Sequence, residues 1–404
     1  MSSSGELSSG LTDEWRAESL RGAEGFFRVG RAANDRWWLI DPTGRPFFCK
    51  AVHGVQKPPG ADQVPVPPDP ASRLRAWGFN AVGLGDGTGR EEGFPFVESV
   101  EFCDAGHVIA GPGVRLPDVF DPEWAAWSAK HAAQLCPPLR NERALLGWVS
   151  DAGLQWAPPG SEGRPSLLQI CLSAEPRYAA YHAAWEFVLA LHRGSLEGLA
   201  RAWGVPIANK EVVREFTRAE RGFATRGYLR DDLRWTREFA RRYFATTSAA
   251  IRAVDPHHLL LGCRGPSRAG SAVLAECAHP AVDIAMPSWT DLPANGPVLA
   301  DNVCWAEPAI FNPLTGGKGV RRLTAVERML RRGRVALERL AKHPGVVGYF
   351  WPQWHDDLSD QPPFGRGLVH INAVEAREHT ELLTLFNARA EALRHKAALV
   401  PAAP

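Results

Sequence analysis

Short apolar runs alternate with longer segments of helical period along most of the chain. Between most of these runs, apolar residues recur every three to four positions, as they do on one face of a helix. The apolar runs cover residues 47–55, 79–84, 97–102, 145–149, 259–263, 282–286, 298–304 and 346–351. The helical segments cover residues 121–139, 179–203, 231–254 and 324–343. Eight strands that alternate with helices predict an α/β fold, a (β/α)₈ TIM barrel.

The ends of the chain and one long insertion interrupt this alternation. Residues 1–25 are polar and rich in serine and glycine, which predicts a flexible N-terminal tail before a barrel over residues 26–398. The turn-forming segment 41–44 lies between two apolar runs and predicts a hairpin just before the first strand. Residues of about 155–230, between strands four and five, are rich in charge and helical pattern. We expect them to form a helical insertion that covers the barrel mouth.

Composition narrows the class of protein. The 46 basic and 45 acidic residues nearly cancel, so no strong field would hold nucleic acid or an anionic membrane. No apolar stretch approaches the roughly 20 residues of a membrane span. The first ten residues show no signal-peptide pattern, which favours a cytoplasmic location.

Cysteine and histidine spacing favours neither a disulfide framework nor a metal site. The seven cysteines are odd in number, scattered and free of CxxC spacing. The pairs at His257 and His258 and at His355 and Asp356 lack a second ligand set. We therefore expect no metal and no other cofactor.

Tryptophan is the unusual feature of the composition, with 15 Trp against 5 Tyr and 3 Met. The flat face of an indole ring suits the apolar face of a sugar, whose hydroxyl groups bond to the rim of the site. Ordinary core packing is the alternative for any single tryptophan.

In a barrel of this type the active site lies at the carboxyl ends of the strands. The candidates are therefore the polar and aromatic residues around these ends: His53, Asp86, His107, Ser150, Asp151, Trp289, Asp301, Asn302, Glu307, Trp354, His355, Asp356 and Asp357. Asp151 and Asp301 can supply a pair of carboxylates for acid/base chemistry. The alternatives are a helix cap for Asp151 and a hydrogen-bonded rim position for Asp301.

Several sequence blocks in a fixed order resemble the agarase-like glycoside hydrolases of the retaining (β/α)₈ clan, over most of residues 30–395. The blocks are WWLIDPTGRPFFCKAVHGV, WGFNAVGLGDG, LPDVFDPEW, NERALLGWVSDAGLQW, RRYFATTSAAIRAVDPHHLLLGCR, VDIAMPSW, GPVLADNVCW and GVVGYFWPQWHDD with FGRGLVHI. The resemblance implies the same barrel fold and a carbohydrate or glycoside as ligand.

The resemblance also implies degenerate catalytic motifs. The family's strand-four block ends in Asp-Asn-Glu, where Asn contacts the sugar 2-hydroxyl and Glu protonates the leaving oxygen. The matching residues here are Asp151, Ala152 and Gly153, so the contact and the acid are both missing. The nucleophilic Glu of strand seven falls on Asn302, or on Asp301 after a slip of one residue, and Glu307 is the remaining acid close by.

The sugar-binding residues that the resemblance implies match the family more closely than the catalytic residues do. Trp351, Gln353 and Trp354 match a segment that lines the sugar site in the family, and His53 replaces an amide-type residue. With the rim candidates, the expected substrate-binding set is His53, Asp86, Trp289, Asn302, Trp351, Gln353, Trp354 and His355.

Three hypotheses follow. In the first, the barrel binds or remodels a glycan, an oligosaccharide or a glycosylated small molecule, and ordinary hydrolysis is lost or altered. In the second, it is an active glycosidase whose carboxylates are relocated to Asp151, Asp301 or Glu307. In the third, it is a non-catalytic scaffold that binds a partner.

Overall fold

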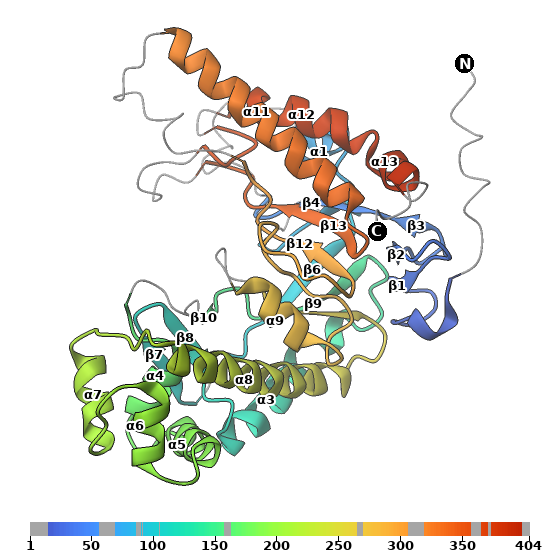
Figure 1. Ribbon diagram of the computed structural model, residues 1–404. Coiled ribbons are helices and arrows are strands. Elements are labelled where there is room, and N and C mark those ends of the chain that lie inside the picture. Colours follow the sequence, from blue (N-terminus) through green and yellow to red (C-terminus); the bar gives the residue numbers. More distant parts are fainter. Residues whose placement is uncertain are drawn as a thin grey trace, which may run out of the picture.

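The fold is a parallel barrel surrounded by helices (Figure 1). The computed structural model describes residues 15–55, 69–85, 90, 92–104, 106–156, 163–264, 270–305, 319–356, 365–370 and 373–397. Seven parallel strands lie in the order β11-β9-β6-β5-β4-β13-β12. They are β4 (Cys49–Val52), β5 (Ala81–Val82), β6 (Phe96–Val100), β9 (Leu145–Ser150), β11 (Leu259–Gly262), β12 (Val298–Ala300) and β13 (Val346–Trp351).

Segment 283–288 closes the sheet between its two edge strands. Met286 forms a parallel bridge with Arg264, just after β11, and Ala285 forms one with Val298 at the start of β12. The amide of Leu299 also donates to the carbonyl of Ala285 at 2.9 Å. The predicted (β/α)₈ barrel is thus confirmed, and its sixth strand consists of isolated bridges that continue to the pair Ser288 and Asp301.

Helices cover the outside of the barrel on both sides seen in Figure 1. One side carries α1 (Pro70–Ala76), α11 (Gly319–Lys342), α12 (Arg377–Asn387) and α13 (Ala390–Ala397). The other carries α3 (Pro122–Leu135), α8 (Arg226–Arg252) and α9 (Ser271–Ala278). The predicted helices at 121–139, 231–254 and 324–343 correspond to α3 with a following 3₁₀ turn, to α8 and to α11.

An N-terminal antiparallel sheet packs against the interior of the barrel. It consists of β1 (Arg28–Arg31), β2 (Trp37–Ile40) and β3 (Pro46–Phe47). Its buried Val29 and Leu39 belong to the same apolar cluster as Ala51 and Val347 of the barrel strands. The predicted hairpin turn is present, because Asp41 accepts the amides of Thr43 and Arg45 and Gly44 has a φ of 89°.

The predicted flexible tail is wrong for residues 15–25. Trp15 forms an antiparallel bridge with Ala32 and Arg21 forms one with Val29, so this segment adds to the edge of the N-terminal sheet. The strand β1 leaves backbone groups at its edge, and the polar segment before it satisfies them. Residues 1–14 lie outside the described residues.

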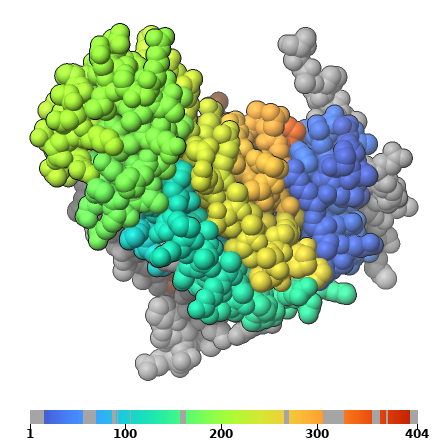
Figure 2. All heavy atoms as spheres, turned by 90° about the horizontal axis from the view of Figure 1, so that it is seen from below, coloured from blue at the N-terminus to red at the C-terminus, as the bar shows by residue number. Residues whose placement is uncertain are grey.

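The insertion is helical, as predicted, and projects from one end of the molecule (Figures 1 and 2). It contains α4 (Leu167–Ser173), α5 (Ala179–Leu191), α6 (Leu196–Trp203) and α7 (Lys210–Arg218) and packs on α8. The predicted helix 179–203 is split into α5 and α6 because Gly194 has a φ of 71° and Ser195 caps α6. A small antiparallel sheet that the sequence did not predict joins β7 (Val108–Gly111), β8 (Val114–Pro117) and β10 (Gln155–Trp156).

Candidate functional site

Three polar side chains meet at the carboxyl ends of the strands, and we call them the Asp301 cluster. His53 follows β4, Arg264 follows β11 and Asp301 follows β12. Asp301 Oδ1 lies 3.0 Å from His53 Nε2, and Asp301 Oδ2 accepts a hydrogen bond of 2.9 Å from Arg264 Nε. Arg264 Nη2 also donates to Oδ1 at 3.4 Å. The cluster thus contains two predicted residues, His53 and Asp301. Its third member, Arg264, was not among the candidates from the sequence.

The backbone around the cluster fixes the protonation of His53. The amide of Leu84 donates to His53 Nδ1 at 2.9 Å, so the imidazole proton is on Nε2 and is donated to Asp301. Burial lowers the pKa of His53 and outweighs the effect of its bond to Asp301. Burial would raise the pKa of Asp301, but the charge of Arg264 and the hydrogen bond from His53 hold it well below its usual range. The cluster is therefore a neutral histidine, an aspartate anion and an arginine cation.

Small and aromatic neighbours hold the imidazole of His53 in place. The ring stacks on Phe350 with centroids 4.7 Å apart and an interplanar angle of 17°. On the strand beside it, a Cβ at Gly83 would lie 2.2 Å from His53 Nδ1. Only glycine leaves room for the ring at this position.

Asp151, the predicted partner carboxylate, is wholly buried and bonded to the protein. Its Oδ1 accepts the amides of Phe102 and Cys103 at 2.7 and 2.8 Å, and its Oδ2 lies 2.6 Å from the Tyr243 hydroxyl. Burial raises the pKa of Asp151 to about 7 despite these bonds. Asp151 also has a φ of 59°, which turns the chain at the end of β9. These contacts favour a structural role for Asp151, because no part of it faces solvent.

Glu101 is a candidate residue that the sequence analysis missed. It follows β6 directly, and the Ala152 amide is 3.2 Å from each of its carboxylate oxygens. The predicted third strand ran to residue 102 and therefore placed Glu101 inside the strand. Glu101 was for this reason not among the candidates at the strand ends. At Gly153, the position that matches the family's acid, an added Cβ would meet no atom of the described residues within 4 Å. The structure thus has a carboxylate beside an open position.

The tryptophans predicted to bind a sugar differ in exposure. Trp351 is buried against Trp305, with its Nε1 donating to the carbonyl of Arg366 at 2.7 Å. Trp354 is buried against Trp77. A stacking platform needs an exposed ring face, so the expectation that these two rings provide one is not met in this conformation. Trp289 is half-buried.

Asn302, Gln353 and His355 are further candidates that the structure describes. Asn302 is half-buried with a φ of 57°, and Gln353 is half-buried. His355 pairs through its backbone with Val369 after β13. Asp86 and Glu307 lie outside the described residues, as does Asp357.

The described parts of the chain contain no group of three His, Cys, Asp or Glu side chains that could hold a metal ion. All seven cysteines are free thiols. None of the described helices is long and apolar enough to span a bilayer.

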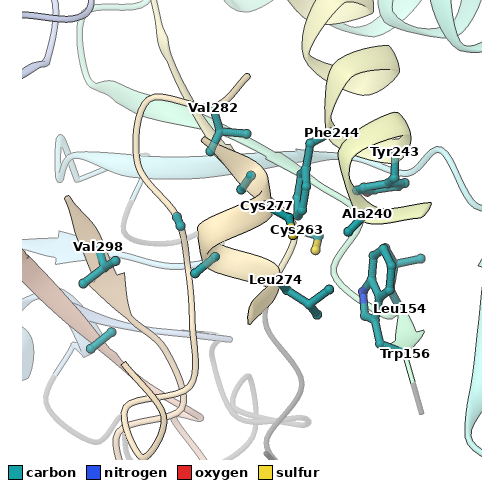
Figure 3. Close-up of a cluster of buried hydrophobic side chains, with 14 of the residues drawn as sticks. Leu154, Trp156, Ala240, Tyr243, Phe244, Cys263, Leu274, Cys277, Val282 and Val298 are labelled. Carbon is teal, nitrogen blue, oxygen red and sulfur yellow. The ribbon is translucent and has the colours of Figure 1, made fainter. Parts of the chain in front are cut away.

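A small cavity lies under α9. Its lining includes Phe244, Cys263 and Leu274, which belong to the buried apolar cluster shown in Figure 3. Its free volume of about 10 Å³ is comparable to one water molecule. A sugar ring does not fit there.

Solved structures show the same architecture at low sequence identity. PfGH50B has a TM-score of 0.67 and 15% identity, with 93% of this chain and 68% of that chain covered. An exo-β-agarase has a TM-score of 0.64 and 15% identity, with 92% and 66% covered. BpGH50 has a TM-score of 0.65 and 15% identity, with 96% and 90% covered.

This chain therefore spans about two thirds of the length of the first two structures and most of the third. No protein-family model matches the chain, and no curated protein matches it. The chain has the fold of the agarase-like glycoside hydrolases.

Proposed function

We propose that the protein binds a short carbohydrate, either an oligosaccharide or a glycosylated small molecule, at the carboxyl-end mouth of the barrel. The observation that carries the proposal is the Asp301 cluster, an ion pair with a neutral histidine at the end of strand seven. The fold it shares with solved agarases supports a carbohydrate as the ligand.

Arg264 is the part of this cluster that a ligand would meet. Its side chain is 25% exposed, whereas that of Asp301 is 2% exposed. Its contacts with Asp301 use Nε and Nη2, which leaves the N–H groups of Nη1 to donate to sugar hydroxyls. Asp301 fixes the orientation of the guanidinium, so little side-chain entropy is lost when the ligand binds.

We further propose that ordinary retaining hydrolysis with a strand-four acid does not operate. Ala152 and Gly153 carry no group that can orient a hydroxyl or donate a proton. Asp151 cannot take over this role in the described conformation, because its carboxylate is occupied by two amides and a hydroxyl.

Tryptophan fluorescence titrated with a panel of neutral agaro- and galacto-oligosaccharides tests the binding. We expect a saturable response, and a flat response across the panel would overturn the proposal. Arg264→Gln should raise the Kd about 10- to 100-fold, the value of a lost charge-assisted hydrogen bond. Arg242→Gln is the control, since Arg242 is half-exposed on α8 and pairs with Glu238. This control should bind as the parent does.

A further inference from the structure

We propose that Glu101 is the proton donor of this barrel and replaces the acid missing from strand four. The inference rests on the proposed function, because it needs a carbohydrate bound at the mouth. It moves the acid from the end of the fourth strand to the end of the third, which is its neighbour in the sheet. The residues that carry this proposal all lie in the described part of the chain.

The direction of β6 places Glu101 on the inner side of the mouth. Side chains alternate across a strand, and Val97 of β6 belongs to the apolar cluster inside the barrel. Glu101 lies four positions further on, at the carboxyl end, and so shares the inward side with Val97. Glu101 is half-buried, so part of the residue is accessible. A proton donor for a ligand needs both properties.

The end of β9 holds this carboxylate beside the vacant acid position. Val100 pairs with Ser150, so Glu101 and Asp151 follow at the same level of two adjacent strands. The Ala152 amide then lies 3.2 Å from both oxygens of Glu101. At the next residue, Gly153, where the family's glutamate side chain would project, no atom of the described part of the chain would lie within 4 Å of an added Cβ. Glu101 is thus oriented by the same segment that has lost the acid.

Asp151 supports this position without taking part in the reaction. Burial raises the pKa of Asp151, and the charge of Glu101 adds to this rise. Asp151 orders the chain after β6 by accepting the amides of Phe102 and Cys103, the two residues after Glu101. Asp151 is therefore a positioning residue for Glu101.

The reaction that this arrangement supports is hydrolysis of a glycosidic bond. Protonated Glu101 gives its proton to the leaving oxygen as the bond between that oxygen and the anomeric carbon breaks. The oxygen of a water molecule then forms a bond to the anomeric carbon, and the deprotonated Glu101 takes the proton that this water loses. Glu101 ends protonated, and one water is consumed for each bond broken.

Dependence on the leaving group tests the role of Glu101. The substrates are phenyl and 2,4-dinitrophenyl glycosides of the sugar that binds in the fluorescence panel. A phenoxide needs protonation to leave, whereas a dinitrophenoxide does not. Glu101→Gln should therefore lower kcat/KM for the phenyl glycoside by about 10²–10⁴-fold. The loss for the dinitrophenyl glycoside should be at least tenfold smaller.

Two further variants complete this test, one as a control and one as a rescue. Glu98→Gln is the control, because Glu98 lies on the same strand but is directed to Arg90, 3.7 Å away. It should behave as the parent. The double variant Glu101→Gln/Gly153→Glu returns a carboxyl to strand four and should recover part of the phenyl glycoside activity. Glutamine can still accept the Ala152 amide, so the single variant is expected to fold.

The outcomes separate the inference from the proposed function. Equal losses for both substrates in Glu101→Gln would overturn the role as proton donor. A parent that binds the sugar but cleaves neither glycoside would also overturn it and would leave the proposed binding intact. A parent that binds no sugar of the panel would overturn both.

Discussion

At the scale of single residues, two buried aspartates of the barrel mouth are held in opposite ways. Asp301 faces a cation and a histidine donor, and its pKa lies below its usual range. Asp151 faces two amides and a hydroxyl, with no cation of the described residues bonded to its carboxylate, and burial raises its pKa to about 7. Amides and hydroxyls stabilise a carboxylate less than a guanidinium does, so burial outweighs them. Identical side chains therefore have pKa values shifted in opposite directions.

The raised pKa of Asp151 predicts a pH-dependent stability. Between the pKa of about 3.9 for an unfolded aspartate and about 7 in the fold, the folded protein keeps a proton that the unfolded chain has lost. The free energy of unfolding should therefore fall as the pH rises through this range. Asp151→Asn should remove this contribution and be about 1–4 kcal/mol more stable than the parent at pH 8.

Urea denaturation at pH 5 and pH 8 measures this effect. Asparagine tolerates the positive φ at this position and keeps the acceptor for Phe102 and Cys103. If the parent and the variant lose the same free energy of unfolding between the two pH values, the structural account of Asp151 is wrong.

A methyl group at Gly83 should disable the Asp301 cluster. The Cβ of Gly83→Ala would lie 2.2 Å from His53 Nδ1 and would displace the imidazole from Leu84 and Asp301. We expect at least tenfold weaker sugar binding and a loss of about 1–3 kcal/mol in stability, typical of overpacking. Leu385→Ala is the control, since Leu385 is 58% exposed on α12. Fluorescence titration and urea denaturation of both variants check the prediction; equal effects would contradict it.

Sequence reasoning found part of the site at this scale. The search around the carboxyl ends of the predicted strands identified His53 and Asp301, because each is a polar residue at or beyond the middle of an apolar run. It missed Glu101 because the predicted strand was two residues too long. It missed Arg264 because residues just after strand five were not considered, and an arginine becomes a candidate only once its buried carboxylate partner is known. Contacts between distant strands are not visible in the pattern of one chain.

At the scale of elements, the N-terminal sheet is part of the barrel core. Its apolar residues fill the interior together with those of β4 and β13. The sequence predicted the hairpin from its turn, but it did not predict that residues 15–25 pair with β1. Those residues are polar and are ordered by backbone pairing. The hydrophobic periodicity of a sequence does not indicate such pairing.

Truncation of Leu39 tests this contribution. Leu39 is wholly buried in the interior cluster, so Leu39→Ala should cost about 2–5 kcal/mol. The control Leu385→Ala, at a position 58% exposed, should change stability by less than about 0.5 kcal/mol. Urea midpoints measure both. A loss below about 1 kcal/mol for Leu39→Ala would mean that the sheet is not integral to the core.

At the scale of the whole molecule, the fold was predictable because it depends on many weak signals in order. Seven of the eight apolar runs are strands of one parallel sheet, and the eighth run, 282–286, overlaps the segment that closes it. Errors of a few residues at each strand end leave this architecture unchanged. The same errors decide which side chains enter a site, which explains why the fold was predicted better than the chemistry.

The central claim is that carbohydrate binds at the Asp301 cluster. A crystal structure with the oligosaccharide that saturates the fluorescence response tests it most directly. We expect sugar hydroxyls within about 3.2 Å of the Arg264 guanidinium. We also expect the Glu101 carboxyl on the side of the glycosidic oxygen. A sugar bound to the helical insertion, or anywhere away from these side chains, would contradict the account.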